Sequence, residues 1–205
     1  MQGRLSTQST FFITDYRCLD HADFTNGKNL AHRVHQRDMQ PENSDRLRLL
    51  VDKQKGVFTR AKEFVDNKYS SLVIQEASSS SKFVDILKVH DFNYITKIIE
   101  KVSKLQGTNN KQLDTLENGD TTISELTWQA ALLAAGAAVQ AVDAVMSGEY
   151  RNAFCATRPP GHHAGVFGRT FHEDDPRKAC SNGFCFINNV AVAASYAMSQ
   201  YRNQI

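Results

Sequence analysis

The sequence has no excess of charge of either sign. Its 205 residues include 24 lysines and arginines against 22 aspartates and glutamates, which gives a net charge of +2 at pH 7. Proteins that track a phosphate backbone carry a basic excess, so this balance gives no support to direct binding of nucleic acid. No basic run of the kind that serves as a nuclear signal is present either.

The sequence also lacks a long apolar run. The first ten residues, MQGRLSTQST, are polar where a signal peptide would place its apolar segment. The longest apolar run, residues 130–139, is about half of the length that spans a bilayer. We therefore expect no membrane association and an intracellular location, with nucleus and cytoplasm equally open.

Cysteines are few, and their spacing is irregular: Cys18, Cys155, Cys180 and Cys185. Paired ligands at the spacing of a structural zinc site are missing, since the nearest pair, Cys180 and Cys185, is one residue too widely spaced. Two of the four cysteines lie in apolar segments, which favours buried reduced thiols. From these spacings we expect no metal site in this chain.

What the sequence does contain is the composition of one globular domain. Hydrophobic residues make up 41% of the chain and charged residues 22%, which is enough to bury a sizeable core. The serine run 78–81 could be a linker, but a helical pattern resumes directly after it, which favours a helix cap. We expect residues 1–205 to form a single domain.

Periodicity predicts strands that alternate with helices. Apolar runs of strand length occupy 10–16, 70–77 and 152–157, and helical spacing occupies 44–51, 57–67, 82–90, 92–105, 126–146 and the end of 183–198. Ser44 is the expected cap of the first helix, and Thr122 with Glu125 has the spacing of a capping box before the longest one. Such alternation is typical of an α/β protein with a mainly parallel sheet.

The segment ATRPPGHHAG, residues 156–165, carries the clearest chemistry. His162 and His163 follow a double proline and stand between Gly161 and Gly165, whose backbones can adopt angles that other residues avoid. The segment follows a predicted buried strand, and open α/β sheets bind ligands at the carboxyl ends of their strands. One neutral imidazole could accept a proton from water while the other stabilises the developing charge.

Other interpretations of this loop stay open. One histidine could cap a carbonyl while the other is solvated, or the loop could grip an anion in a binding module. Two adjacent histidines seldom reach one metal ion with good geometry. His172, Asp174 and Asp175 in the polar insertion that follows could suggest a metal site, but such a cluster is more often an exposed acidic turn.

Five segments in order resemble the histone deacetylase superfamily, which also contains acetylpolyamine amidohydrolases. They are QPENSDRL, LKVHDFNYI, NGDTTISELTWQAALLAAGAAVQAVDAV, RPPGHHAG and GFCFINNVAVAA. The Arg-Pro-Pro form of the histidine loop is similar to the class II branch, while Gln40 stands where the family often has histidine. The resemblance covers most of residues 10–200 and implies an arginase/deacetylase-type α/β fold. That fold is a three-layer, mainly parallel sheet with helices on both faces, and its C-terminal part would be missing from this chain.

The resemblance also implies zinc-dependent hydrolysis of acetyl-lysine or a related acetamide. It makes His163 the general base and then acid, and His162 its electrostatic partner. The remaining implied positions are the acyl-lysine tunnel at Gly183 and Phe184 with Cys185 near its foot, the rim that grips the substrate at Asp120, and the internal cavity at Arg46.

The zinc ligands of the family, an Asp-x-His pair and a later aspartate, would fall beyond Ile205. The resemblance thus implies zinc as cofactor of a complete protein and none for this chain alone. It implies an acetylated protein, histone or non-histone, or an acetylpolyamine as substrate, with corepressor-type proteins as further partners. The alternative is a non-catalytic truncated chain that acts through protein contacts.

Overall fold

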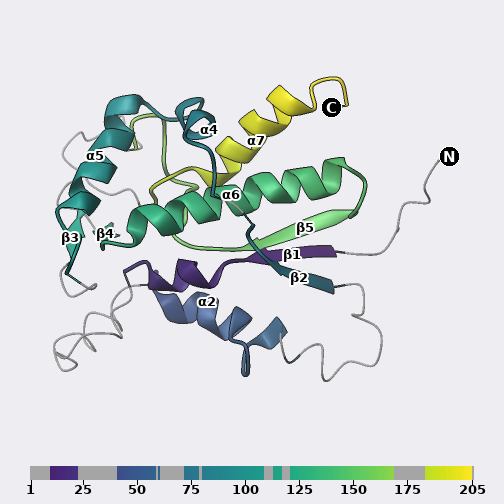
Figure 1. The fold of residues 1–205 in the computed structure, drawn as a ribbon, viewed down its shortest axis with the longest axis horizontal. Helices are drawn as coiled ribbons and strands as arrows, with labels where there is room; N and C mark the ends of the chain where they lie inside the picture. The colour runs from purple at the N-terminus through teal and green to yellow at the C-terminus, as the bar shows by residue number, and fades with distance from the viewer. Residues whose placement is uncertain are drawn as a thin grey trace, which may run out of the picture.

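The computed structural model describes most of the chain (Figure 1). The described residues are 10–22, 41–58, 60, 72–78, 80–108, 113–116, 121–168 and 183–204. Within them the elements are, in chain order, β1 (Thr10–Thr14), the 3-10 helix η1 (Tyr16–Asp20), α2 (Ser44–Val51), β2 (Leu72–Glu76), α4 (Phe83–Leu87), α5 (Phe92–Ser103), β3 (Asp114–Thr115), β4 (Thr122–Ile123), α6 (Thr127–Met146), β5 (Asn152–Ala156) and α7 (Asn189–Gln200).

Three parallel strands form the central sheet in the order β2-β1-β5. β1 pairs along its whole length with both neighbours, so that Thr14 at its carboxyl end lies opposite Glu76 and Ala156. Parallel strands require crossover connections over a face of the sheet, and the chain between β2 and β5, the two strands that flank β1, supplies one that contains α4, α5 and α6 (Figure 1). The three predicted strands are therefore confirmed, and their carboxyl ends share one edge.

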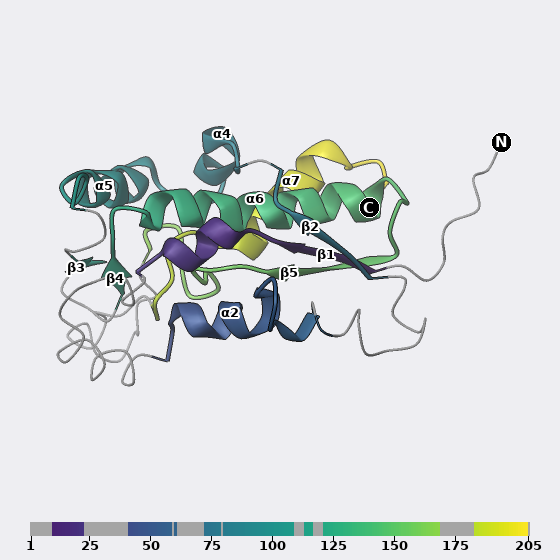
Figure 2. The same ribbon diagram turned by 60° about the horizontal axis from the view of Figure 1, so that its bottom comes forward.

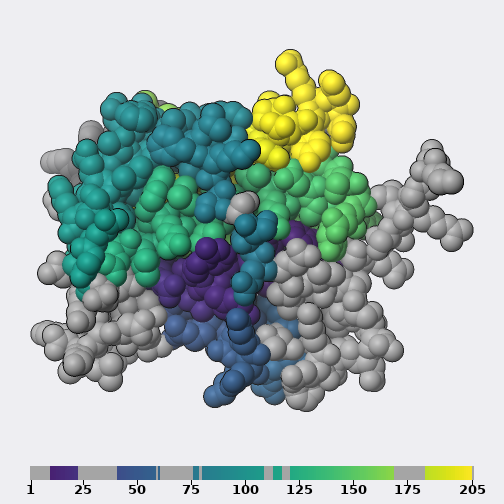
Figure 3. Space-filling view, viewed as in Figure 1, coloured from purple at the N-terminus to yellow at the C-terminus, as the bar shows by residue number. Residues whose placement is uncertain are grey.

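Helices cover both faces of this sheet, which gives three layers (Figure 2). Side chains alternate along a strand, and in β1 Phe11 and Ile13 pack on the side of α6 while Phe12 packs against Leu47 and Val51 of α2. The space-filling view shows α4 and α5 beside α6, with α7 next to α4 (Figure 3). The predicted three-layer α/β arrangement is confirmed.

The longest helix, α6, is buried through small side chains. Ala137, Ala141 and Ala144 pack in one cluster with Phe11 and Ile13 of the sheet, and alanine lets the helix approach the strands closely. By length and composition α6 could also cross a membrane, but half of its apolar segment is buried within the protein. Its apolar character is thus explained by its place in the core.

The predicted starts of two helices are wrong. Asn43 rather than Ser44 caps α2, because the Asn43 side chain accepts a hydrogen bond from the Asp45 N–H at 3.1 Å and Ser44 is already helical. The expected capping box fails because Thr122 pairs in β4, and α6 begins only at Thr127.

The serine run does not cap α4 either. This helix follows Lys82 and has no side-chain cap, while Ser81 instead donates its backbone N–H to the Leu132 carbonyl at 2.9 Å. The run therefore ties the start of α4 to α6. The predicted helix over 57–67 lies largely outside the described residues.

Candidate active site

The histidine loop follows the carboxyl end of β5 directly, as predicted. Two backbone hydrogen bonds between Gly165 and Gly168, of 3.2 and 3.0 Å, fold its far end back on itself. The rings of His162 and His163 lie together, with centroids 4.2 Å apart, and both side chains are exposed. The sheet therefore presents two adjacent imidazoles at the edge where α/β proteins bind ligands.

Both histidines line a single cavity of about 570 Å³. The same cavity is lined by Gly183 and Phe184, which come from the turn before α7, and by Arg46 of α2. Five of the predicted site residues thus meet in one place although they come from three separate parts of the chain.

The turn opposite the histidines packs against them closely. A Cβ atom added to Gly183 would lie 2.6 Å from Cδ2 of His163, so only glycine fits there without displacing the ring. Phe184 has a φ of +66°, a left-handed conformation that costs a non-glycine residue about 1–2 kcal/mol. Such local strain is often found at functional sites.

The remaining predicted positions lie beside or outside this cavity. Cys185 is buried behind the turn, where its Sγ accepts a hydrogen bond from the His163 N–H at 3.5 Å. Asp120 lies outside the described residues, as do His172, Asp174 and Asp175. The neighbour of Asp120, Thr121, is buried and its Oγ1 accepts from the Phe184 N–H at 3.2 Å. Thr121 therefore contacts the turn at Phe184.

Gly161 and Gly165 are expected to adopt backbone angles that other residues avoid, and the structure shows a different role. Among the described residues, neither Gly161 nor Gly165 has a positive φ. Gly161 is needed for close approach, since an added Cβ would lie 1.8 Å from the Ile187 carbonyl oxygen. The positive φ belongs to Gly168, at +84°, which packs directly on the ring of Tyr94.

The described cysteines are thiols held away from solvent, as expected. Cys18 and Cys185 are buried and Cys155 is half-buried. Burial raises the pKa of Cys18 to about 12 and that of Cys155 to about 11, so neither offers a thiolate nucleophile near neutral pH. Cys180 lies outside the described residues.

Sequence reasoning missed a buried ion pair under the histidine loop. Nε and Nη2 of Arg158 donate to the two carboxylate oxygens of Glu42 at 2.8 and 2.9 Å, and both residues are buried. Nη1 of Arg158 donates to the carbonyls of Cys18, Leu19 and His21 at 3.2, 3.4 and 2.6 Å. The guanidinium therefore joins the end of η1, the segment before α2 and the strand-end loop.

His21 completes this buried network. Its Nδ1 lies 2.9 Å from Oγ1 of Thr127, and its Nε2 lies 3.8 Å from Glu42. Burial, and then the charge of Arg158, lower the pKa of His21 well below its ordinary value. The folded protein therefore holds this imidazole neutral.

We expect acid to destabilise the fold through His21. Below about pH 6.5 the unfolded chain binds a proton at this residue that the folded chain does not bind. The free energy of unfolding should therefore fall by about 1.4 kcal/mol per pH unit as the pH decreases from 6.5. Burial also lowers the pKa of His90, so urea unfolding between pH 5 and 7.5 should show a smaller slope in His21→Gln than in the wild type, reduced by the contribution of His21.

Val166→Ala provides the control for this measurement. Val166 is exposed and its side chain carries no ionisable group, so this variant should leave the pH dependence of the unfolding free energy unchanged. Equal slopes in the wild type and His21→Gln would contradict the assignment to His21.

The described residues do not assemble a metal site by themselves. Within the described ranges, no three histidine, cysteine, aspartate or glutamate side chains come together in a way that could hold a metal ion. What the described residues bring to the cavity is the pair of imidazoles of His162 and His163 and the guanidinium of Arg46.

Comparison with known proteins identifies the family to which this architecture belongs. The family model of the histone deacetylase domain matches residues 40–205, so this chain belongs to the histone deacetylase family. The crystal structure of the HDA15 HD domain superimposes with a TM-score of 0.65 at 25% identity, over 94% of this chain and 44% of that one. The expected deacetylase-type fold is thereby confirmed.

Relatives of known name extend the comparison. Type-2 histone deacetylase 2 of Dictyostelium discoideum is 38% identical over 131 residues, which are 55% of this chain and 7% of that protein. Polyamine deacetylase HDAC10 of Danio rerio is 36% identical over 119 residues, 57% of this chain and 15% of that protein. The "Probable deacetylase" of Archaeoglobus fulgidus is 31% identical over 162 residues, 78% of this chain and 36% of that protein. The chain spans less than half the length of each.

Proposed function

We propose that this chain supplies the proton-transfer residues of a zinc-dependent deacetylase that hydrolyses acetyl-lysine or a related acetamide. The observation that carries the proposal is the pair of imidazoles at the carboxyl end of β5, which share a cavity with the Gly183–Phe184 turn. Membership of the histone deacetylase family supports the reaction class.

In this proposal His163 acts first as base and then as acid. It removes a proton from a water molecule while the water oxygen attacks the acetamide carbonyl carbon. It then gives that proton to the amine nitrogen as the C–N bond breaks, which releases acetate and a free amine. His162, whose ring lies 4.2 Å away, stabilises the charge that His163 gains in between.

The other residues of the cavity would bind the substrate and the product. Gly183 and Phe184 line the path of the acyl-lysine side chain, and the thiol of Cys185 lies at its inner end. Asp120 grips the substrate backbone at the rim. Arg46, which lines the same cavity, offers a cation for the acetate that is released.

Zinc dependence is proposed from membership of the deacetylase family. The described residues do not form a metal site by themselves. Its ligands are expected in a polypeptide that reaches the full length of the family's domain, of which this chain spans 44% in the HDA15 comparison. Both an acetylated protein and an acetylpolyamine are proposed as substrates, since relatives are named for each. Corepressor-type partners and a location in nucleus or cytoplasm stay predictions.

The test compares two polypeptides, residues 1–205 and a version extended to the full domain length. The short chain should contain no stoichiometric zinc by elemental analysis and should release no acetate, because a catalytic zinc needs about three protein ligands. The extended polypeptide should bind zinc and release acetate from an acetyl-lysine peptide or from an acetylpolyamine.

Two results would contradict the proposal. Tight zinc and turnover in the short chain, lost on changing His163, would show that its metal site is complete. An extended polypeptide that binds zinc but hydrolyses neither substrate would remove the deacetylase function.

A further inference from the structure

The cavity lies between two segments, the histidine loop (residues 157–168) and the segment at the start of α7 (residues 183–189), which we call its two walls. His90 forms a hydrogen bond with each wall. Its Nδ1 donates to the Gly165 carbonyl at 2.9 Å, and its Nε2 accepts from the Asn188 N–H at 2.9 Å. A backbone N–H can only donate, so Nε2 must be unprotonated and Nδ1 must carry the hydrogen. The ring is buried, and this burial lowers the pKa of His90, which favours the neutral form that both contacts require.

Tyr94, one turn further along the chain, bridges the same two walls. Its hydroxyl donates to the Phe186 carbonyl at 2.7 Å, two residues after Phe184. Its ring forms the surface on which Gly168 packs, since an added Cβ there would lie 2.1 Å from the ring. One side chain thus holds the end of the histidine loop and the turn together.

Asn188 closes the arrangement from the side of α7. Its Nδ2 donates to the Ala164 carbonyl at 3.0 Å, while its Oδ1 accepts from the Ala191 N–H and caps the helix. The start of α7 is therefore fastened directly to the residue after His163.

These bonds are shorter than the other contacts between the two walls. The Phe186 N–H reaches the Pro160 carbonyl at 3.3 Å, and Nδ2 of Asn189 reaches the Pro159 carbonyl at 3.4 Å. Hydrogen bonds of 2.7–3.0 Å lie near the optimum, whereas those of 3.3 Å and beyond are weaker. His90, Tyr94 and Asn188 thus hold the two walls together by hydrogen bonds, at a separation close enough that Gly161 touches the Ile187 carbonyl.

We propose that His90 and Tyr94 are positioning residues that hold His163 at a fixed distance from the Gly183–Phe184 turn. Neither lines the cavity, so each acts through the backbone of the two walls. The consequence for catalysis rests on the proposed function: a displacement of about 1 Å between reacting groups can cost about a hundredfold in rate.

Cys185 is a built-in reporter of this spacing, because its Sγ lies between the His163 N–H and the Gly183 carbonyl. We would measure the iodoacetamide alkylation of each cysteine of residues 1–205 by mass spectrometry. His90→Phe and Tyr94→Phe should raise the alkylation rate of Cys185 about tenfold or more. Cys18, which is fully buried elsewhere, should keep its wild-type rate.

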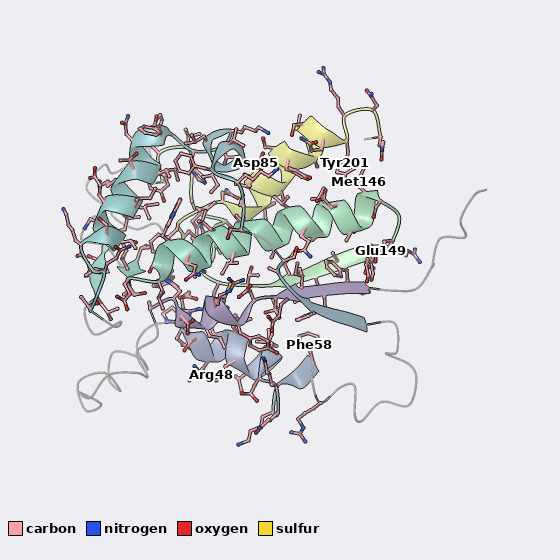
Figure 4. All side chains as sticks on the ribbon, in the orientation of Figure 1. Arg48, Phe58, Asp85, Met146, Glu149 and Tyr201 are labelled. Atoms are coloured by element: carbon pink, nitrogen blue, oxygen red, sulfur yellow. The ribbon has the colours of Figure 1, made fainter. Side chains whose placement is uncertain are left out.

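Tyr201→Phe is the matched control for Tyr94→Phe. The Tyr201 hydroxyl donates to Asp143 of α6 at 2.8 Å, near the end of α6 that Met146 marks and away from α5 (Figure 4). Tyr201→Phe therefore removes one comparable tyrosine hydrogen bond, and it should leave the alkylation rate of Cys185 unchanged.

Partial rescue separates positioning from mere packing. In His90→Asn the amide can still donate toward Gly165, and in His90→Gln the amide oxygen can still accept from Asn188. Both variants should therefore alkylate Cys185 more slowly than His90→Phe. Failure of either amide to rescue would overturn the hydrogen-bonding role.

Two further outcomes would overturn the proposal. Cys18 and Cys185 could become reactive together, which would mean that the variants loosen the whole fold, or Cys185 could stay protected.

In an active extended polypeptide, Tyr94→Phe should lower kcat about tenfold with KM within about twofold, and an unchanged kcat would also overturn the proposal. If the wild type lacks deacetylase activity, the proposed function fails while the alkylation result still decides the positioning role.

Discussion

Replacing His163 by alanine is expected to lower the rate of acetamide hydrolysis about 10²- to 10⁴-fold, which is the usual contribution of one general base. The effect is expected in a polypeptide extended to the full domain length, measured as kcat/KM with an acetyl-lysine peptide. The zinc content should stay unchanged, because the proposal gives His163 a proton-transfer role and no bond to the metal.

Val166→Ala provides the control for this experiment. Val166 is exposed on the same loop, and its backbone carbonyl accepts from the Asp91 N–H at 2.9 Å, a bond that alanine keeps. It should therefore retain wild-type activity. Full activity in His163→Ala would remove His163 from its role, and loss of zinc from that variant would make His163 a ligand instead.

The strands could be predicted because each is a short apolar run bounded by polar residues. Helix starts could not, because caps depend on which nearby backbone group is unpaired. The capping box at Thr122 and Glu125 has the correct spacing, yet the backbone of Thr122 pairs with Thr115 and is not available to start a helix. Here a nonlocal strand pairing overrides a local signal.

That the site residues lie close together could be predicted from the sequence only in part. His162 and His163 follow a strand, and the rule for strand ends places them at the ligand-binding edge. The proximity of Gly183 and Phe184 came from family resemblance, since nothing local in their sequence indicates what they face. The need for glycine at position 161 arises from contact with Ile187, which sequence alone does not place nearby.

The buried pair of Arg158 and Glu42 is the clearest contact that local sequence could not predict. The two residues are 116 positions apart, and each lies in a segment that resembles the family. A charged residue in such a segment is read first as exposed or functional. Their burial against each other appears only when η1, α2 and the histidine loop are assembled.

Arg158→Met is expected to lower the free energy of unfolding by about 3–5 kcal/mol, because it leaves the carboxylate of Glu42 buried without its counter-charge. It also deprives the carbonyls of Cys18, Leu19 and His21 of their donor. Urea unfolding of residues 1–205 at pH 7 measures the loss. The half-exposed pair of Arg48, which Figure 4 labels, and Asp45, with Nη1 and Oδ1 2.6 Å apart on α2, provides the control. Arg48→Met should cost less than about 1 kcal/mol.

The double variant Arg158→Met with Glu42→Leu separates charge from hydrogen bonding. Removing both charges should recover part of the lost stability, because a buried ion pair replaced by apolar side chains costs far less than a broken one. Recovery should stay incomplete, since the three carbonyls still lack their donor and each unsatisfied buried group costs about 1–3 kcal/mol. A double variant no more stable than Arg158→Met would mean that the carbonyl contacts, and not the ion pair, fix the histidine loop to the sheet. Equal losses in Arg158→Met and Arg48→Met would show that burial of the pair does not decide its contribution.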